Sequence, residues 1–224
     1  CLYTIGAPRV GIVSYARDMT RQIPQSQIRR IANPCDPVPM VPVFPYAHAS
    51  NGPSEFLLNH GDKLGIEAHL LHDGYSRMAY SNSWTDFASM PNALSSRVDL
   101  AREFARLGGG NMFNTKLLDL IGRLTKRVLL DMGYVLMVTT QGALSMAFTA
   151  VDLLAEVLLK AANTSKLMAD EVLTIVNSIL SFMGRAPVSS ALLTIQTLHW
   201  VLGQFSTEMA GRAQLAMLKA QKPG

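Results

Sequence analysis

The stretch that decides the fold of the first part of the chain is residues 2–34, which read LYTIGAPRVGIVSYARDMTRQIPQSQIRRIANP. Two short β-prone runs, Leu2–Ile5 and Ile28–Ala32, are ended by a glycine and by Asn-Pro, and both read as strands. Between them, Val13–Gln22 is expected to form a helix. Strand, helix and strand within about thirty residues are typical of a parallel βαβ unit, whose functional loops follow the carboxyl ends of the strands.

Composition limits what the whole chain can be. With 224 residues, of which 49% are apolar and 16% charged, it can bury a sizeable core, and disorder is excluded. The net charge of +4 comes from no run of basic residues, so a nucleic acid is not the expected partner. Two cysteines, Cys1 and Cys35, form neither a disulfide framework nor a Cys-x-x-Cys metal motif, and no metal site is expected.

The chain changes character near Met90. Residues 1–90 hold eight of the eleven prolines and four of the five histidines, which is typical of loop-rich sequence that carries sites. Residues 91–224 have no proline between Pro91 and Pro187 and predict a helical extension. The expected helices cover about Val98–Leu107, Thr115–Leu130, Met132–Ala162, Lys166–Met183 and Val188–Lys219. The sequence thus predicts an α/β part at 1–90 and an all-α part of unknown role at 91–224.

Three motifs occur in order in the first part: LYTIGAPRVG at residues 2–11, IRRIANPCDPVP at residues 28–39 and YAH at residues 46–48. Together they resemble the class 3, or fungal-type, lipase family of the α/β-hydrolase fold, whose pattern runs approximately Y-T-x-G-x-P-R-V-G, N-x-x-D-x-V-P and Y-x-H-x-G. The resemblance covers residues 1 to roughly 85 and implies the C-terminal part of that fold. One departure is Ser50, where the family has glycine. The matched motif residues are Gly6, Pro8, Arg9, Gly11, Asn33, Pro39 and His48.

The resemblance implies a Ser-Asp-His triad, of which this sequence supplies two members. Asp36 matches the family's acid, although an aspartate before proline also often caps a turn. The general base is expected in an H-x-x-Y-like segment, which His72-Asp73-Gly74-Tyr75 fits best. His69, three residues earlier on the same expected helical face, is the alternative base, and His60 is a weaker one. His48 and Arg9 are expected to be structural, and Cys35 a buried thiol.

The serine of the implied triad is absent, because no G-x-S-x-G occurs in these 224 residues. The sequence opens at Cys1 inside an apolar strand, and the nucleophile, the oxyanion-hole amides and any signal region are expected before it. The sequence therefore leaves the cellular compartment undetermined, and both secretion and membrane association are compatible with it. The intact enzyme is expected to hydrolyse carboxylic esters of lipids without a metal or organic cofactor, whereas this chain alone is expected to be inactive.

Two long uncharged segments raise the question of a membrane. Met132–Val151 and Ala186–Thr207 have twenty and twenty-two residues without a charge, about the length of a bilayer span. Their Ser, Thr and Gln content favours buried bundle helices, with a transmembrane span and a membrane-surface or partner-binding helix as the alternatives. The alternative function is accordingly a non-enzymatic, membrane-associated or partner-binding helical module that carries a hydrolase remnant. The oligomeric state stays open.

Overall fold

The structure is a computed structural model that describes residues 1–41, 46–49, 55–58, 63–80, 83–84, 87–89, 96–107, 112–133 and 151–221. The chain folds into two compact units. The first contains Cys1–Asn92 and the C-terminal stretch Glu208–Gly224, and the second contains Ala93–Thr139 and Ala143–Thr207.

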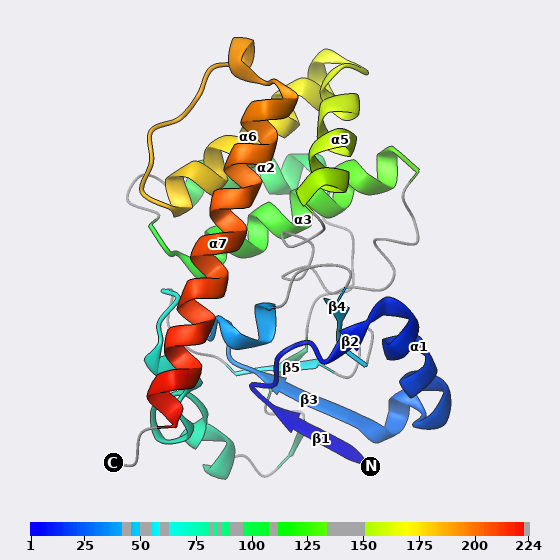
Figure 1. Ribbon diagram of the computed structural model, residues 1–224, viewed down its shortest axis with the longest axis vertical. Helices are drawn as coiled ribbons and strands as arrows, with labels where there is room; N and C mark the ends of the chain where they lie inside the picture. Colours follow the sequence, from blue (N-terminus) through cyan, green and yellow to red (C-terminus); the bar gives the residue numbers. More distant parts are fainter. Residues whose placement is uncertain are drawn as a thin grey trace. The chain divides into compact units, whose positions relative to one another are not determined.

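A small, mostly parallel sheet forms the centre of the first unit (Figure 1). Strands β1 (Leu2–Ile5), β3 (Ile28–Ala32) and β5 (Glu55–Leu57) are parallel, and β6 (Ala88–Ser89) adds to β5 in the antiparallel sense, giving the order β1-β3-β5-β6. The expected α/β arrangement followed by a helical region is confirmed. Because β1 and β3 are parallel neighbours, the loops that follow them leave the sheet at the same edge.

The connection from β1 to β3 contains the expected helix. Helix α1 (Val13–Gln22) follows β2 (Gly11–Ile12), which pairs with β4 (Tyr46–Ala47) in a separate two-stranded sheet. The bounds of β1, α1 and β3 are those predicted from the sequence. Short helical turns complete the unit at Gln25–Gln27, Val38–Met40, Glu67–His69, Leu71–Tyr75 and Ser76–Tyr80.

The core of the first unit lies against β3. Ile31, Leu58 and Tyr75 form its buried cluster, and Trp84 and Phe56 pack against that cluster with their ring centroids 4.9 Å apart. Tyr75 is only 2% exposed, although it carries a hydroxyl, and a buried hydroxyl needs hydrogen-bond partners. Those partners are the Asn33 amide and the Asp36 carboxylate, both in the turn that follows β3.

The second unit is helical (Figure 1). It comprises α2 (Arg97–Leu107), α3 (Thr115–Asp131), α5 (Val151–Ala162), α6 (Lys166–Phe182) and the first part of α7 (Ile195–Ala220). Helix α3 packs on both α2 and α6, and α6 also packs on α5. Side chains cap several of these helices; for example, Asn114 accepts from the Leu117 amide at 3.1 Å, and Ser165 accepts from the Met168 amide at 3.2 Å.

Ion pairs join the helices of the second unit. Arg97 on α2 donates to Asp131 on α3 at 2.6 Å and to Glu171 on α6 at 2.5 Å, so one guanidinium links three helices. Arg123 on α3 pairs with Glu103 on α2. Both arginines are thus paired with carboxylates of the same unit, which is a structural role.

Two of the expected helices do not begin at the residue that the sequence predicts. The helix expected from Met132 does not start there, because α3 ends at Asp131 and Gly133 takes a φ of +82°. Residues 134–150 lie outside the described residues, and α5 begins at Val151. The helix expected from Val188 begins at Ile195 instead, after a short turn at Ser190–Leu192.

No helix in the described part of the chain is both long enough and apolar enough to span a bilayer. The segment Ala186–Thr207 is divided between a loop and the beginning of α7. Most of Met132–Val151 lies in residues that the structure does not describe.

Candidate active site

The turn after β3 positions Asp36 at the carboxyl edge of the sheet. Asn33 shapes this turn, because its side-chain Oδ1 accepts from the Cys35 amide at 2.9 Å and its carbonyl accepts from the Asp36 amide at 2.9 Å. Such side-chain bonds to the backbone two residues on are the reason asparagine favours turns. Cys35 itself is buried and is a free thiol. The carboxylate of Asp36 is thereby directed into the protein and is 0% exposed.

Three donors surround the Asp36 carboxylate. The Val38 amide donates to Oδ1 at 2.8 Å, and the Tyr75 hydroxyl donates to Oδ2 at 2.7 Å. The Nδ1 of His69 lies 2.9 Å from the same Oδ2. A buried carboxylate with this many donors is satisfied in its charged form, whereas an unpaired one would be costly to bury.

Burial nevertheless raises the pKa of the Asp36 carboxyl above its ordinary value of 3.8, although the hydrogen bonds from Tyr75, His69 and the Val38 amide favour the charged form and oppose that rise. The charged state of Asp36 thus depends on these donors. Removing one of them shifts the balance further toward the protonated carboxyl.

Tyr75 connects the loops that follow β1 and β3. Its hydroxyl accepts from the Asn33 amide at 3.2 Å while it donates to Asp36. Burial, together with the neighbouring carboxylate, raises the pKa of Tyr75, so the phenol stays protonated and remains a donor. Gly6, which ends β1 with a φ of +56°, lies against this phenol: a Cβ there would meet the Tyr75 hydroxyl oxygen at 2.7 Å. Gly6 also donates to the Ile31 carbonyl at 2.9 Å, which ties the two strand ends together.

A second set of contacts attaches the His69 segment to the Asp36 turn. The Asn33 amide Nδ2 donates to the carbonyl of Gly74 at 3.1 Å and, at 3.4 Å, to that of Ala68. Gly74 is required here, because a Cβ on it would lie 1.9 Å from the Ala68 carbonyl oxygen. One asparagine side chain therefore holds both the acid's turn and the histidine's turn.

The geometry of His69 fits a general base. If Nδ1 donates to the ionised Asp36, the neutral ring carries its free lone pair on Nε2. The His69 side chain is 18% exposed, so the ring is largely enclosed but not sealed from a reactant. An imidazole held by a buried carboxylate in this tautomer can take a proton from a hydroxyl and later return it.

His72 is not the partner of Asp36, and the expectation that favoured it over His69 is corrected by this geometry. Its side chain is 78% exposed, and its Nε2 lies 3.0 Å from Asp73. The two histidines do not share a helical face, because Leu70 between them is extended, with φ −72° and ψ 140°. The remaining candidate, His60, lies outside the described residues.

The other motif residues build the surroundings of this pair. His48 donates from Nε2 to the Pro39 carbonyl at 2.8 Å, on the loop after Asp36. Burial and the charges of Arg30 and Arg9 hold the pKa of His48 well below its usual value, so it is a neutral donor. Arg9 is buried, and its backbone amide donates to the Val41 carbonyl at 2.9 Å. Gly11 lies in β2, and Pro8 lies half-buried in the loop that leads to it.

Sequence reasoning missed the roles of two side chains. Tyr75 and Asn33 both stand inside quoted motifs, but their hydrogen bonds to the Asp36 and His69 loops join residues 35 to 42 positions apart and are not visible in a local pattern. Among the described residues, no three His, Cys, Asp or Glu side chains converge as metal ligands would.

Comparison with known proteins adds no relative: no protein-family model, no curated protein and no solved structure matches this chain. The likeness to class 3 lipases therefore stays a prediction from the three sequence motifs.

Proposed function

We propose that Asp36 and His69 are the acid and the base of a serine-hydrolase triad that cleaves carboxylic esters of lipids. The observation that carries the proposal is the 2.9 Å contact between His69 Nδ1 and the fully buried Asp36 carboxylate, at the carboxyl edge of a parallel sheet. The choice of a lipid ester is supported by the resemblance of the three motifs to class 3 lipases.

The reaction assigns each residue one task. A serine hydroxyl attacks the ester carbonyl while His69 Nε2 takes its proton, and Asp36 stabilises the imidazolium that forms. The imidazolium then protonates the departing alcohol, which leaves an acyl-serine. A water molecule, deprotonated by the same Nε2, attacks this acyl group, and the carboxylic acid departs as the serine regains its proton. Because no G-x-S-x-G occurs in the chain, the serine and its oxyanion-hole amides are assigned to sequence outside these 224 residues.

The test uses the natural gene product that contains these residues, expressed together with any coding sequence that precedes residue 1. Hydrolysis of p-nitrophenyl octanoate is expected to fall by about 10⁴-fold in His69→Ala and in Asp36→Asn, as for other triads. His72→Ala is the matched control, since that exposed histidine is expected to leave the rate within about twofold.

Two outcomes would overturn the proposal. Either His72→Ala abolishes activity while His69→Ala preserves it, or the gene product shows no ester hydrolysis and does not react with a fluorophosphonate that labels activated serines. The second outcome would favour the non-enzymatic module instead.

The acid limb of the pH–rate profile provides a second readout. Because burial raises the pKa of Asp36, the carboxyl takes up a proton above pH 3.8, and the rate is expected to fall as pH decreases through that raised pKa. Tyr75→Phe removes a donor that favours the charged form, so it should move this limb to higher pH. A limb unchanged in Tyr75→Phe contradicts the role assigned to Asp36.

A further inference from the structure

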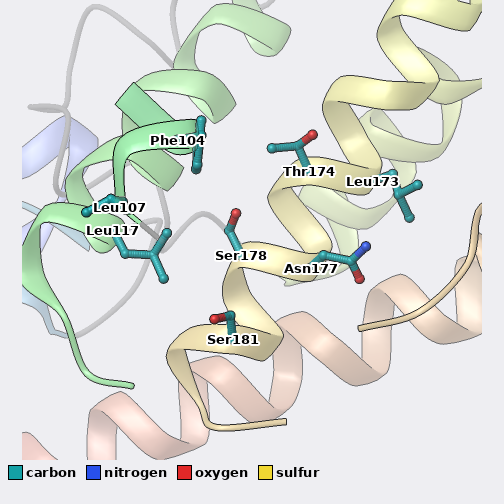
Figure 2. Close-up of a pocket in the computed structure, with 8 residues that line it drawn as sticks. All are labelled: Phe104, Leu107, Leu117, Leu173, Thr174, Asn177, Ser178 and Ser181. Atoms are coloured by element: carbon teal, nitrogen blue, oxygen red, sulfur yellow. The ribbon is translucent and has the colours of Figure 1, made fainter. Parts of the chain in front are cut away.

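The second unit contains a pocket of about 360 Å³ between helices α2, α3 and α6 (Figure 2). Its lining residues are Phe104, Leu107, Leu117, Leu173, Thr174, Asn177, Ser178 and Ser181. All eight are of types that carry no charge. The volume lies near the lower end of the range of small-molecule sites.

The two walls of this pocket differ in polarity. Phe104 and Leu107 on α2 and Leu117 on α3 form an apolar wall. Apart from Leu173, the opposite wall is polar, because residues 174, 177, 178 and 181 of α6 recur at the spacing of one helix face. A ligand that matches both walls has an alkyl part and an uncharged hydrogen-bonding part.

Ser178 and Ser181 supply the hydroxyls of the polar wall for which the described residues provide no hydrogen-bond partner, and Ser178 is the more deeply buried of the two. The Thr174 hydroxyl donates to the Asp170 carbonyl at 2.8 Å, and Asn177 is bonded to both backbone groups of Val188. Ser178 is 9% exposed, and among the described residues its hydroxyl has no hydrogen-bond partner. Figure 2 shows its side chain pointing away from α6 into the space in front of Leu117. Because this hydroxyl is open to the pocket, it can both donate a hydrogen bond to a ligand there and accept one.

We propose that this pocket binds a medium-chain primary alcohol, with the alcohol oxygen on Ser178 and the alkyl chain against Phe104, Leu107 and Leu117. At about 30 Å³ for each heavy atom, the volume share of a water molecule, the pocket accommodates roughly a dozen such atoms. An ionised amphiphile is disfavoured, because the eight lining residues offer no counter-charge and burial of an unpaired charge is costly. The site does not involve Asp36 or His69, so it stands or falls independently of the proposed hydrolase.

The test is titration of the full chain with 1-octanol, followed by amide chemical shifts. Saturable binding of one molecule is expected, and octanoate, which has the same chain length but a charge, should bind at least about tenfold more weakly. Ser178→Ala should weaken octanol binding about fivefold through the lost hydrogen bond, and Ser178→Leu should abolish it by filling the space.

Thr174→Val is the matched control, because that hydroxyl already has a partner and its loss should change the affinity by less than about twofold. Thermal melting checks that each variant is folded. If Ser178→Leu does not fold, the affinity of Ser178→Ala for octanol is the deciding measurement. The proposal is overturned by non-saturable binding, by octanoate binding as tightly as octanol, or by unaltered binding in Ser178→Ala.

Discussion

Replacement of Tyr75 by phenylalanine removes one oxygen atom from the centre of the Asp36 site, and we expect it to destabilise the first unit by about 3 kcal/mol at pH 7. The hydroxyl donates to the buried Asp36 at 2.7 Å, and a hydrogen bond to a charged group contributes about 1.5–3 kcal/mol. The same oxygen accepts from the Asn33 amide, and an unsatisfied buried donor costs about 1–3 kcal/mol. The two losses share one atom, so they are not expected to add in full.

The penalty should depend on pH. The raised pKa of Asp36 means that the folded unit binds a proton more tightly than the unfolded chain, so its stability falls as pH rises from 3.8 through the raised pKa. Tyr75→Phe raises that pKa further. The loss is therefore expected to be largest at pH values above the raised pKa, where Asp36 is charged, and to become smaller as the pH is lowered toward 3.8 and the carboxyl takes up its proton.

Urea unfolding followed by tryptophan fluorescence measures this effect in one unit only. The chain has two tryptophans, Trp84 against the core cluster of the first unit and Trp200 in the second. A Trp200→Phe background leaves Trp84 as the reporter. Tyr80→Phe is the matched control, because Tyr80 is 83% exposed and should change stability by less than about 0.5 kcal/mol. A loss below about 1 kcal/mol for Tyr75→Phe at pH 7, or a loss that does not decrease as the pH is lowered from 7 to 3.8, would refute the reasoning.

Two further substitutions test the backbone geometry. Gly74→Ala should lower the free energy of unfolding by more than about 3 kcal/mol, because the new Cβ would lie 1.9 Å from the Ala68 carbonyl oxygen. Gly203→Ala meets nothing within 4 Å and should stabilise α7 by up to about 1 kcal/mol. Thermal melting distinguishes the two signs, and equal effects of the two substitutions would contradict the clash. Asn114→Ala should lower the free energy of unfolding by about 1 kcal/mol, because the Leu117 amide loses its capping acceptor. Urea unfolding followed by the fluorescence of Trp200 measures this loss, and an unchanged midpoint would show that the cap does not stabilise α3.

Local sequence signals account for strands β1 and β3 and for most of the helices, whereas β5 and β6 of the same sheet were not predicted. The bounds of β1, α1 and β3 follow from apolar runs ended by Gly6 and by Asn33-Pro34, signals that act within a few residues. Helix α3 is expected over Thr115–Leu130 and covers Thr115–Asp131 for the same reason.

The predicted start of α7 is wrong because a tertiary contact overrides the local pattern. Val188 is expected to begin that helix, but its amide donates to the Asn177 side chain of α6 at 2.8 Å, which holds it in a loop. Thr194 then provides the cap, accepting from the Thr197 amide at 3.2 Å. The residues next to Val188 do not reveal that its amide bonds to Asn177, so the local pattern does not predict the later start of the helix.

The choice between His69 and His72 depends on a backbone detail that residue spacing does not encode. In a regular helix, His69 and His72 would share one face, because they are three residues apart. The extended backbone at Leu70 interrupts the helix, so the two side chains point in different directions. The resemblance selected Asp36 because that residue lies inside a dense motif. It favoured His72 over His69, whereas His69 is the histidine in contact with Asp36, and the position of His69 depends on Asn33 and Tyr75 contacts made across the fold.

The phenol of Tyr75 also has a consequence for the order in which the chain becomes structured. It follows Asp36 by 39 residues and Asn33 by 42, so during synthesis the carboxylate leaves the ribosome well before its buried donor. The strand-helix-strand segment can form from nearby contacts, while the closing of the longer loop is slower. Until Tyr75 arrives, Asp36 is an ordinary hydrated carboxylate at the end of a partly formed sheet. The acid thus becomes buried late in the folding of its own unit.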